Sequence, residues 1–179
     1  LQIIQGFFAR GSDLQLDFSL FGSGSRSLIG VDISSSSVEM VELGSDGKKG
    51  YRVERYTTEI LPRDAVADGN IVNLEASAET VRRAWKKLGA STRDVAIALP
   101  ASHVSTKKII VPAGQRESEL EVLVESEANQ YIPFALEEVN LDFQIIGPAP
   151  SSPDEIEVLI AASRKEKVED RVAVVESAG

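Results

Sequence analysis

One short segment of this 179-residue chain combines an apolar run, an acid and a cluster of serines. Residues 29–33 read Ile-Gly-Val-Asp-Ile, and four serines at 34–37 follow before the apolar pattern resumes at Val38. A tight turn of small hydroxyl residues directs backbone N–H groups and hydroxyls into one concavity, which suits an anion such as phosphate. Asp32, at the mouth of the turn, could hold Mg²⁺ through water, as this ion prefers on nucleotide phosphates.

The alternative is a β-hairpin that uses serine only for its turn propensity, with Asp32 capping backbone amides. Two common phosphate-binding motifs are absent from the sequence: neither G-x-x-x-x-G-K-[ST] nor G-x-G-x-x-G before a helix occurs. P-loop and Rossmann nucleotide sites are therefore not expected. The residues alone leave the phosphate turn and the plain hairpin both open.

A second candidate segment combines aromatic and acidic residues around a proline. Residues 129–139 read Asn-Gln-Tyr-Ile-Pro-Phe-Ala-Leu-Glu-Glu-Val, and Pro133 is expected to end the helix that precedes it. This would expose Tyr131, Phe134 and Leu136 beside carboxylates. An apolar lip with an acidic rim suits a short peptide with apolar anchors and a basic flank. The alternative is that the proline only stops the helix and the aromatic rings close a small core.

The composition excludes several kinds of chemistry. The chain has no cysteine, so disulfide, thiolate–zinc, iron–sulfur and cysteine-nucleophile chemistry are ruled out. Its single histidine, His103, cannot supply a histidine-rich metal site, and no acid–nucleophile set accompanies it. A formal net charge of −9 argues against nucleic-acid binding through phosphate neutralisation. No apolar run approaches the ~20 residues needed to cross a bilayer.

The acidic residues are concentrated between positions 113 and 142, where eight acids accompany one base. Such a run is usually a solvated face, and a docking surface for a basic partner is the alternative. The eight acids are Glu117, Glu119, Glu121, Glu125, Glu127, Glu137, Glu138 and Asp142.

Hydrophobic periodicity predicts two successive groups of elements, so that we expect a mixed α/β (α+β) fold. The first group follows a flexible Gly/Ser joint at 22–27 and comprises strands at 27–32, 38–43 and 51–60, a loop at 62–69, a helix at 77–88 and a strand at 94–99. The second comprises strands at 103–111, 139–146 and 155–161 and helices at 117–132 and 164–178. The expected parts are an extension and joint at 1–26 and subdomains at 27–102 and 103–179.

Several segments, in their order and spacing, resemble the PilM family of type IV pilus assembly proteins. The resemblance covers residues 19–179, whereas residues 1–18 match nothing in that family. The segments that carry it are Leu28–Val38, Val41–Leu43, Gln130–Phe134, Leu136–Val139, Leu141–Gln144 and Ala161–Lys167.

This resemblance implies an actin-like (ribonuclease H-like) fold, similar to that of the cell-division protein FtsA in the actin-like ATPase superfamily. Residues 27–102 would form the actin-like subdomain. Residues 103–179 would form the small inserted strand–helix–strand–strand (SHS2-like) subdomain. The family implies a cytoplasmic protein, peripheral at the inner membrane, that binds ATP with Mg²⁺ and docks the cytoplasmic N-terminal peptide of PilN. It would thereby link the alignment complex to the pilus motor and to twitching motility.

The resemblance also implies roles for individual residues. Asp32 would face Mg²⁺ through water, and the phosphates would be wrapped by Ser34, Ser35, Ser36 and Ser37. The peptide-docking interpretation of the second segment gains support, with the contacts Tyr131, Pro133, Phe134 and Leu136. Other pilus motor and alignment components are further expected partners, whereas nucleic acid and a direct membrane span are not expected. Two departures stand out: Ser34 replaces the glycine usual in the superfamily, and Ser37 replaces a lysine of FtsA.

Two functions follow from the resemblance, and a third remains outside it. The first is a scaffold in which nucleotide is a structural or regulatory ligand, and the second is a cytoskeletal-type ATPase whose hydrolysis is the main function. The third is a small α+β domain that binds another ligand. Lack of a general-base candidate near Asp32 favours the scaffold. The family's second phosphate segment and adenosine segment are missing from these residues, so we expect this chain alone to bind nucleotide weakly and not to hydrolyse it.

Overall fold

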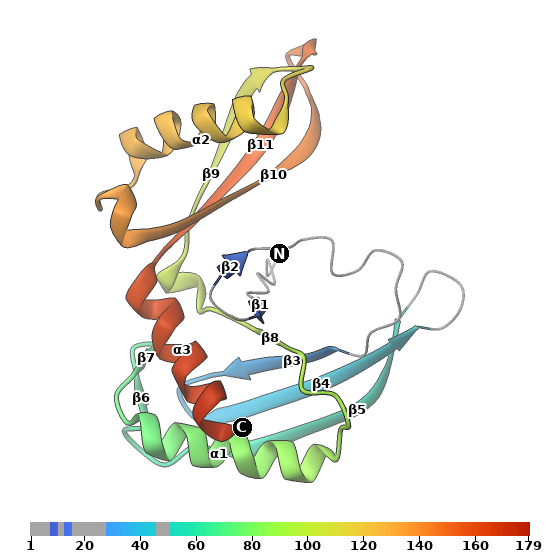
Figure 1. The fold of residues 1–179 in the computed structure, drawn as a ribbon, viewed down its shortest axis with the longest axis vertical. Helices are drawn as coiled ribbons and strands as arrows, with labels where there is room; N and C mark the ends of the chain where they lie inside the picture. The colour runs from blue at the N-terminus through green and yellow to red at the C-terminus, as the bar shows by residue number, and fades with distance from the viewer. Residues whose placement is uncertain (1–7, 11–12, 16–27, 46–50) are drawn as a thin grey trace. The chain divides into compact units, whose positions relative to one another are not determined.

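The computed structural model describes residues 8–10, 13–15, 28–45 and 51–179 (Figure 1). The joint expected at 22–27 and most of the extension at 1–26 lie outside those residues. Within the extension, the described strands β1 (Phe8–Arg10) and β2 (Asp13–Gln15) pair antiparallel. The chain divides into two compact units, unit 1 (Leu1–Pro100 with Val168–Gly179) and unit 2 (Ala101–Lys167).

Unit 1 contains a four-stranded sheet in the order β5–β4–β3–β8 (Figure 1). Its first three strands form the antiparallel meander that the sequence predicts, and β8 pairs with β3 in parallel. The register sets Ile33 opposite Val38, so residues 34–36 connect β3 to β4 and Ser37 is the first residue of β4. The strands are β3 (Leu28–Ile33), β4 (Ser37–Ser45), β5 (Tyr51–Ile60) and β8 (Val95–Ile97).

Helix α1 (Leu74–Leu88) covers one face of this sheet. Asn73 caps its start, since its side chain accepts from the Ala76 amide at 3.0 Å, and Gly89 caps its end in the left-handed conformation. Its buried face meets the apolar face of the strands, because alternate strand residues point to the same side. Core residues of unit 1 include Ile29, Val31, Ile33, Val38, Met40, Val81, Ala84 and Leu88.

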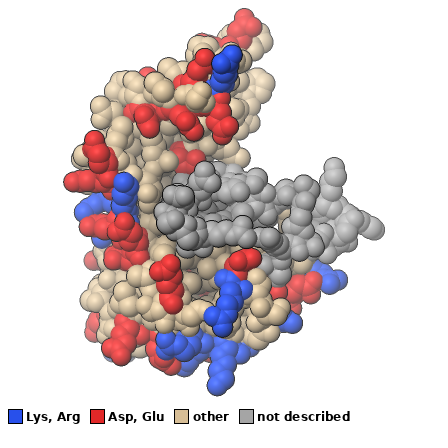
Figure 2. Space-filling view, viewed as in Figure 1, with Lys and Arg blue, Asp and Glu red and all other residues tan. Residues whose placement is uncertain are grey.

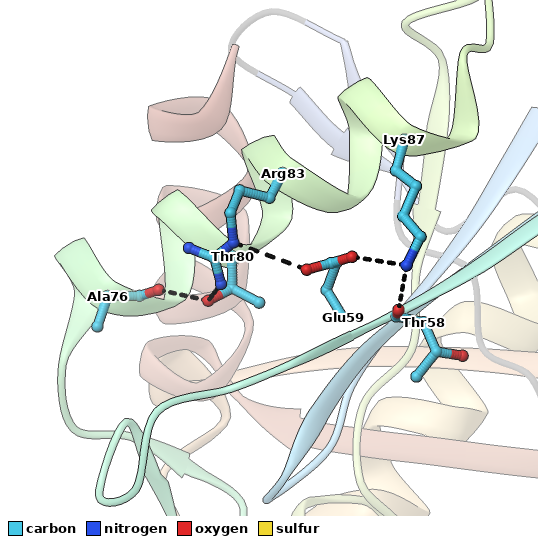
Figure 3. Close-up of polar contacts among 6 residues, drawn as sticks. All are labelled: Thr58, Glu59, Ala76, Thr80, Arg83 and Lys87. Carbon is cyan, nitrogen blue, oxygen red and sulfur yellow. Dashed lines mark hydrogen bonds and ion pairs between the residues drawn. The ribbon is translucent and has the colours of Figure 1, made fainter.

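Polar contacts also tie α1 to the edge strand β5 (Figure 3). Lys87 Nζ lies 2.8 Å from Glu59 Oε1 and donates to the Thr58 carbonyl at 3.3 Å, while Arg83 Nε lies 3.7 Å from Glu59 Oε2. The hydrogen bond from Lys87 holds the pKa of Glu59 below its ordinary value. Arg83 and Lys87 are exposed and Glu59 is partly buried, so these contacts orient the helix on the strand more than they stabilise the unit.

A short hairpin replaces part of the loop expected at 62–69. Its strands β6 (Val66–Ala67) and β7 (Asn70–Ile71) are joined by Asp68 and Gly69, which both have positive φ. Paired positive φ values are typical of a two-residue hairpin turn, and Asp-Gly is a favoured sequence for it. The Asp68-Gly69 pair therefore indicated a hairpin turn. Strands of only two residues are too short to show an alternating apolar pattern.

Helix α3 (Lys165–Ala178) begins in unit 2, and its remainder belongs to unit 1. The sequence places all of 103–179 in the small subdomain. In the structure Val174 is fully buried in the unit 1 core, with Val175 and Ala178 packed against that core. The apolar face of α3 therefore packs into the core of unit 1, although α3 directly follows β11 of unit 2 in the chain.

Unit 2 is an antiparallel sheet in the order β10–β11–β9 with helix α2 against one face (Figure 1). Its core joins Ile109, Val111, Val158 and Ile160 of the sheet to Leu120, Val124 and Ala128 of the helix. The elements are η2 (Ala101–His103), β9 (Ser105–Pro112), α2 (Glu117–Tyr131), η3 (Leu136–Glu138), β10 (Val139–Ala149) and β11 (Ser152–Arg164).

None of the helices in the described part of the chain is both long enough and apolar enough to cross a membrane.

Candidate functional site

The serine turn of unit 1 is organised by one hydroxyl. Ser34 Oγ accepts from the backbone N–H groups of Ser36 at 3.2 Å and Ser37 at 3.0 Å, and it lies 3.0 Å from both the carbonyl and the hydroxyl of Ser37. The Ser34 amide donates to the Ser37 carbonyl at 2.9 Å. Leu61 donates to the Ser36 carbonyl at 2.9 Å, which fastens the turn to the end of β5.

This arrangement refines the phosphate interpretation. Three of the amides expected to face an anion, those of Ser34, Ser36 and Ser37, are already used inside the turn, as the plain-hairpin alternative requires. Ser35 and Ser36 are exposed, and their hydroxyls project from a turn whose shape is fixed. A phosphate would meet these hydroxyls first, and the Ser34 network would hold them in place.

Asp32 is exposed at the end of β3, and the register sets it directly opposite Glu39 of β4. Glu39 is also exposed, and the Ser37 hydroxyl donates to its Oε1 at 3.5 Å. Like charges on directly opposed strand positions destabilise a sheet unless a cation lies between or beside them. Two carboxylates at the mouth of the turn suit a Mg²⁺ held through water.

Within the described residues, no group of three or more His, Asp and Glu side chains could hold a metal ion. At the serine turn, the register brings two carboxylates together, those of Asp32 and Glu39. Glu39 was not among the site residues predicted from the sequence. The signal for it was the hairpin itself, because pairing of position 33 with position 38 sets position 32 opposite position 39.

Behind the turn lies Arg171 of α3, which is 1% exposed. Its Nη1 donates to the Ile33 carbonyl at 2.9 Å and its Nη2 to the Gly69 carbonyl at 3.0 Å. Burial lowers the pKa of Arg171, and the nearby charges of Asp32 and Asp170 oppose that shift. Arg171 was likewise not among the site residues predicted from the sequence. The sequence marks it as unusual, because Arg171 lies on the same helix face as Val168 and Val175, where an apolar residue is expected.

The aromatic segment of unit 2 presents its rings to solvent. Tyr131 is 52% exposed and Phe134 is 39% exposed, so these rings do not close the core. Leu136 is partly buried and packs against the unit 2 core, whereas Pro133 is exposed. The structure therefore splits the expected lip into two solvent-facing rings with the exposed Pro133 between them and one apolar residue, Leu136, that anchors the segment.

A positively charged side chain of this chain lies over each of the two rings, Tyr131 and Phe134. Lys107 Nζ lies 4.1 Å from the centre of the Tyr131 ring, and Arg164 Cζ lies 5.2 Å from the centre of the Phe134 ring. Both distances are within the range of cation–π attraction. The cations come from β9 and β11, so they fix both rings against the sheet. The sequence indicated the acids of this rim but not these cations.

Most of the acidic run between 113 and 142 is exposed, which both the solvated-face and the docking-surface interpretations require. Six of its eight acids are exposed, and only Glu127 and Asp142 are partly buried. Figure 2 shows acidic side chains at several places on the surface of unit 2.

Asp142 of β10 is the exception that has a measurable consequence. Its Oδ1 accepts from the Phe143 amide at 2.8 Å, while its Oδ2 is buried and has no hydrogen-bond partner in the described part of the chain. Burial raises the pKa of Asp142 to about 6, against a weaker opposing effect of the Phe143 amide. The folded state therefore binds this proton more tightly than the unfolded chain, and stability falls as pH rises from about 4 through 6.

We expect Asp142→Asn to be more stable than the original protein at pH 7.5, by on the order of 1 kcal/mol. The advantage should shrink as the pH falls to 5.2, because the original carboxyl is then largely protonated. Urea unfolding at both pH values measures the difference. Glu121→Gln removes an exposed charge of α2 and is the control. An effect of Asp142→Asn that did not change with pH would contradict the assignment.

Comparison with known proteins places the chain in a family and matches its fold. A family model described as type IV pilus assembly protein PilM matches residues 30–179. The solved PilM–PilN type IV pilus biogenesis complex is similar with a TM-score of 0.75 and 25% identity over 87% of this chain. This chain spans 46% of that structure's chain. The expected mixed α/β, actin-like fold is thereby confirmed.

A diol dehydratase-reactivating factor in nucleotide-free form is also similar, with 15% identity over 71% of this chain and 17% of the other. Its TM-score of 0.30 is too low to support an argument about either fold or site.

Proposed function

We propose that this chain, which belongs to the family of the type IV pilus assembly protein PilM, is part of an ATP-binding scaffold that docks the N-terminal peptide of PilN. The observation that carries the proposal is the match of 87% of the chain, at a TM-score of 0.75, to the structure titled a PilM–PilN complex. The scaffold would be cytoplasmic and would reach the inner membrane through PilN. Other motor and alignment components would bind the same scaffold.

The serine turn supports the nucleotide part of the proposal. Exposed hydroxyls of Ser35 and Ser36 stand on a turn fixed by Ser34, and the Asp32–Glu39 pair adjoins it. Phosphate oxygens would accept from the hydroxyls, and Mg²⁺ would neutralise both the phosphates and the carboxylates. Bound nucleotide would therefore relieve the repulsion between the two acids. Asp32 and Glu39 would both be engaged by hydrated Mg²⁺ and not by an attacking water, which is why we propose a nucleotide ligand rather than a substrate.

The aromatic segment supports the peptide part. Tyr131 and Phe134 offer two ring edges for apolar anchors, while Glu137 and Glu138 are exposed beside them. A peptide with apolar anchors followed by basic residues complements this surface. Because Lys107 and Arg164 already lie over the rings, a basic flank would pair with the glutamates and not with the ring faces.

The peptide part is tested by titrating a labelled PilN-type N-terminal peptide into the full-length protein and into this chain. We expect saturable binding that weakens at raised salt, since the basic flank pairs with exposed carboxylates. Phe134→Ala should weaken binding by about tenfold or more, as expected for an aromatic anchor. Val122→Ala, at an exposed apolar position of α2, is the matched control and should bind as the original does.

Two results would decide against peptide docking at this surface. The first is absence of binding by full-length protein that is shown to be folded. The second is equal affinity of the Phe134→Ala and Val122→Ala variants. Binding to the full-length protein alone would mean that residues outside this chain complete the site.

A further inference from the structure

Arg171 is a buried charge that neither the phosphates nor the peptide would touch. Arginine is almost never fully buried without a charged partner, since removing a charge from water is costly. Here the guanidinium is 1% exposed, and its two hydrogen bonds go to backbone carbonyls, Ile33 at 2.9 Å and Gly69 at 3.0 Å. A hydrophobic residue would fill the same space without the free-energy cost of burying a charge. The presence of an arginine here is therefore explained by what its two carbonyl partners do.

The two carbonyls belong to the ends of two different hairpins. Ile33 is the last residue of β3, and the next residue is Ser34, whose hydroxyl organises the serine turn. Gly69 lies in the β6–β7 turn, where both central residues have positive φ. The planar fork of a guanidinium holds two acceptors in a fixed relation, which a lysine ammonium does not. Arg171 therefore fixes the start of the serine turn against a second turn.

The charge of Arg171 is also directed at this turn. Asp32 lies one residue before Ile33, and its carboxylate is the first of two charges that favour the ionised form of Arg171 against its burial. Attraction between Arg171 and Asp32 across the end of β3 offsets part of the repulsion between Asp32 and Glu39.

We propose that Arg171 is a positioning residue for the phosphate turn: by holding the Ile33 and Gly69 carbonyls together, it presets Asp32 and the serine hydroxyls for a nucleotide phosphate. This inference rests on the proposed nucleotide binding and adds to it a residue more than 130 positions away in sequence. It acts through the turn and does not contact the nucleotide.

The test uses Arg171→Met and Arg171→Lys in the full-length protein, with calorimetric titration of Mg·ATP and AMP. Arg171→Met should weaken Mg·ATP binding by about tenfold and AMP binding by less than about twofold. A displaced turn would lose contacts with the terminal phosphates of ATP, which AMP lacks. Arg171→Lys keeps the charge without the fork and should lie between. A general loss of structure would weaken both nucleotides alike.

Hydrogen exchange without nucleotide supplies a second readout that separates this inference from the proposed function. In Arg171→Lys, amides at 33–37 and 66–71 should exchange faster than in the original, while the rest of unit 1 keeps its protection. Arg82→Met is the matched control, because Arg82 on α1 also donates to a carbonyl of α3, that of Ser177 at 2.7 Å. That variant should leave exchange at 33–37 unchanged.

The outcomes separate cleanly. If the original full-length protein binds no Mg·ATP, the nucleotide function fails, and exchange at 33–37 still decides whether Arg171 positions the turn. If Arg171→Met does not fold, Arg171→Lys carries the comparison. Unchanged exchange at 33–37 in Arg171→Lys, or a uniform rise across unit 1, would overturn the inference.

Discussion

Replacing Val124 with aspartate is expected to unfold unit 2 and abolish peptide binding, while unit 1 keeps its structure. Val124 is 1% exposed at the centre of the α2–sheet contact. An unpaired carboxylate there loses its hydration without gaining a partner, at a cost of about 4 kcal/mol or more. Tyr131 ends α2 and Phe134 follows it, so the loss of α2 packing also removes the aromatic surface.

Unit 1 should remain folded because the core of each unit is formed by its own residues. Hydrogen exchange measured unit by unit, together with the peptide titration, checks both expectations. Val122→Asp is the matched control, with the same charge change two residues away on the same helix at a position that is 65% exposed. It should fold and bind peptide. Equal loss of protection in both units of the Val124→Asp variant would show that the units are not separate modules.

Local patterns predicted most of the fold. The apolar spacing of Val81, Ala84 and Leu88 identified α1, because that pattern reports burial on one face. The alternation at 51–60 identified β5, although Thr57 is the one buried residue of that strand. Helix α1 begins three residues earlier than expected, at Leu74, since Asn73 supplies a side-chain cap. The assignment of α3 to unit 1 could not be predicted in this way. An apolar helix face does not say which sheet it will meet.

Prediction of the candidate site was less complete, for a related physical reason. Asp32 and the serines lie in one continuous segment, so their types and spacing were readable. Glu39 follows from strand register, and Arg171 reaches the turn only through tertiary packing of α3. The cations over Tyr131 and Phe134 come from strands distant in sequence. A local pattern can mark such a residue, but it does not identify the distant residue that the marked one contacts.

Ser34→Ala is expected to weaken Mg·ATP binding by the full-length protein by about tenfold, which corresponds to about 1.4 kcal/mol. The Ser34 hydroxyl accepts from two amides and lies 3.0 Å from two oxygens of Ser37, so its removal loosens the whole connection between β3 and β4. The Ser35 and Ser36 hydroxyls would then lose their fixed positions. Binding must restore this order, which costs affinity even though no nucleotide contact is deleted.

Ser34→Thr separates the hydroxyl from the rest of the side chain, because threonine can make the same hydrogen bonds. We expect it to retain most of the affinity, measured by calorimetric titration with Mg·ATP. The opposite result is equally informative about the turn. If Ser34→Ala binds Mg·ATP more tightly than the original, the amides of Ser36 and Ser37 are themselves the phosphate donors, and the Ser34 hydroxyl competes with the ligand for them. The pre-formed turn would then be an inhibited form of the site, and Arg171 would hold it in that form.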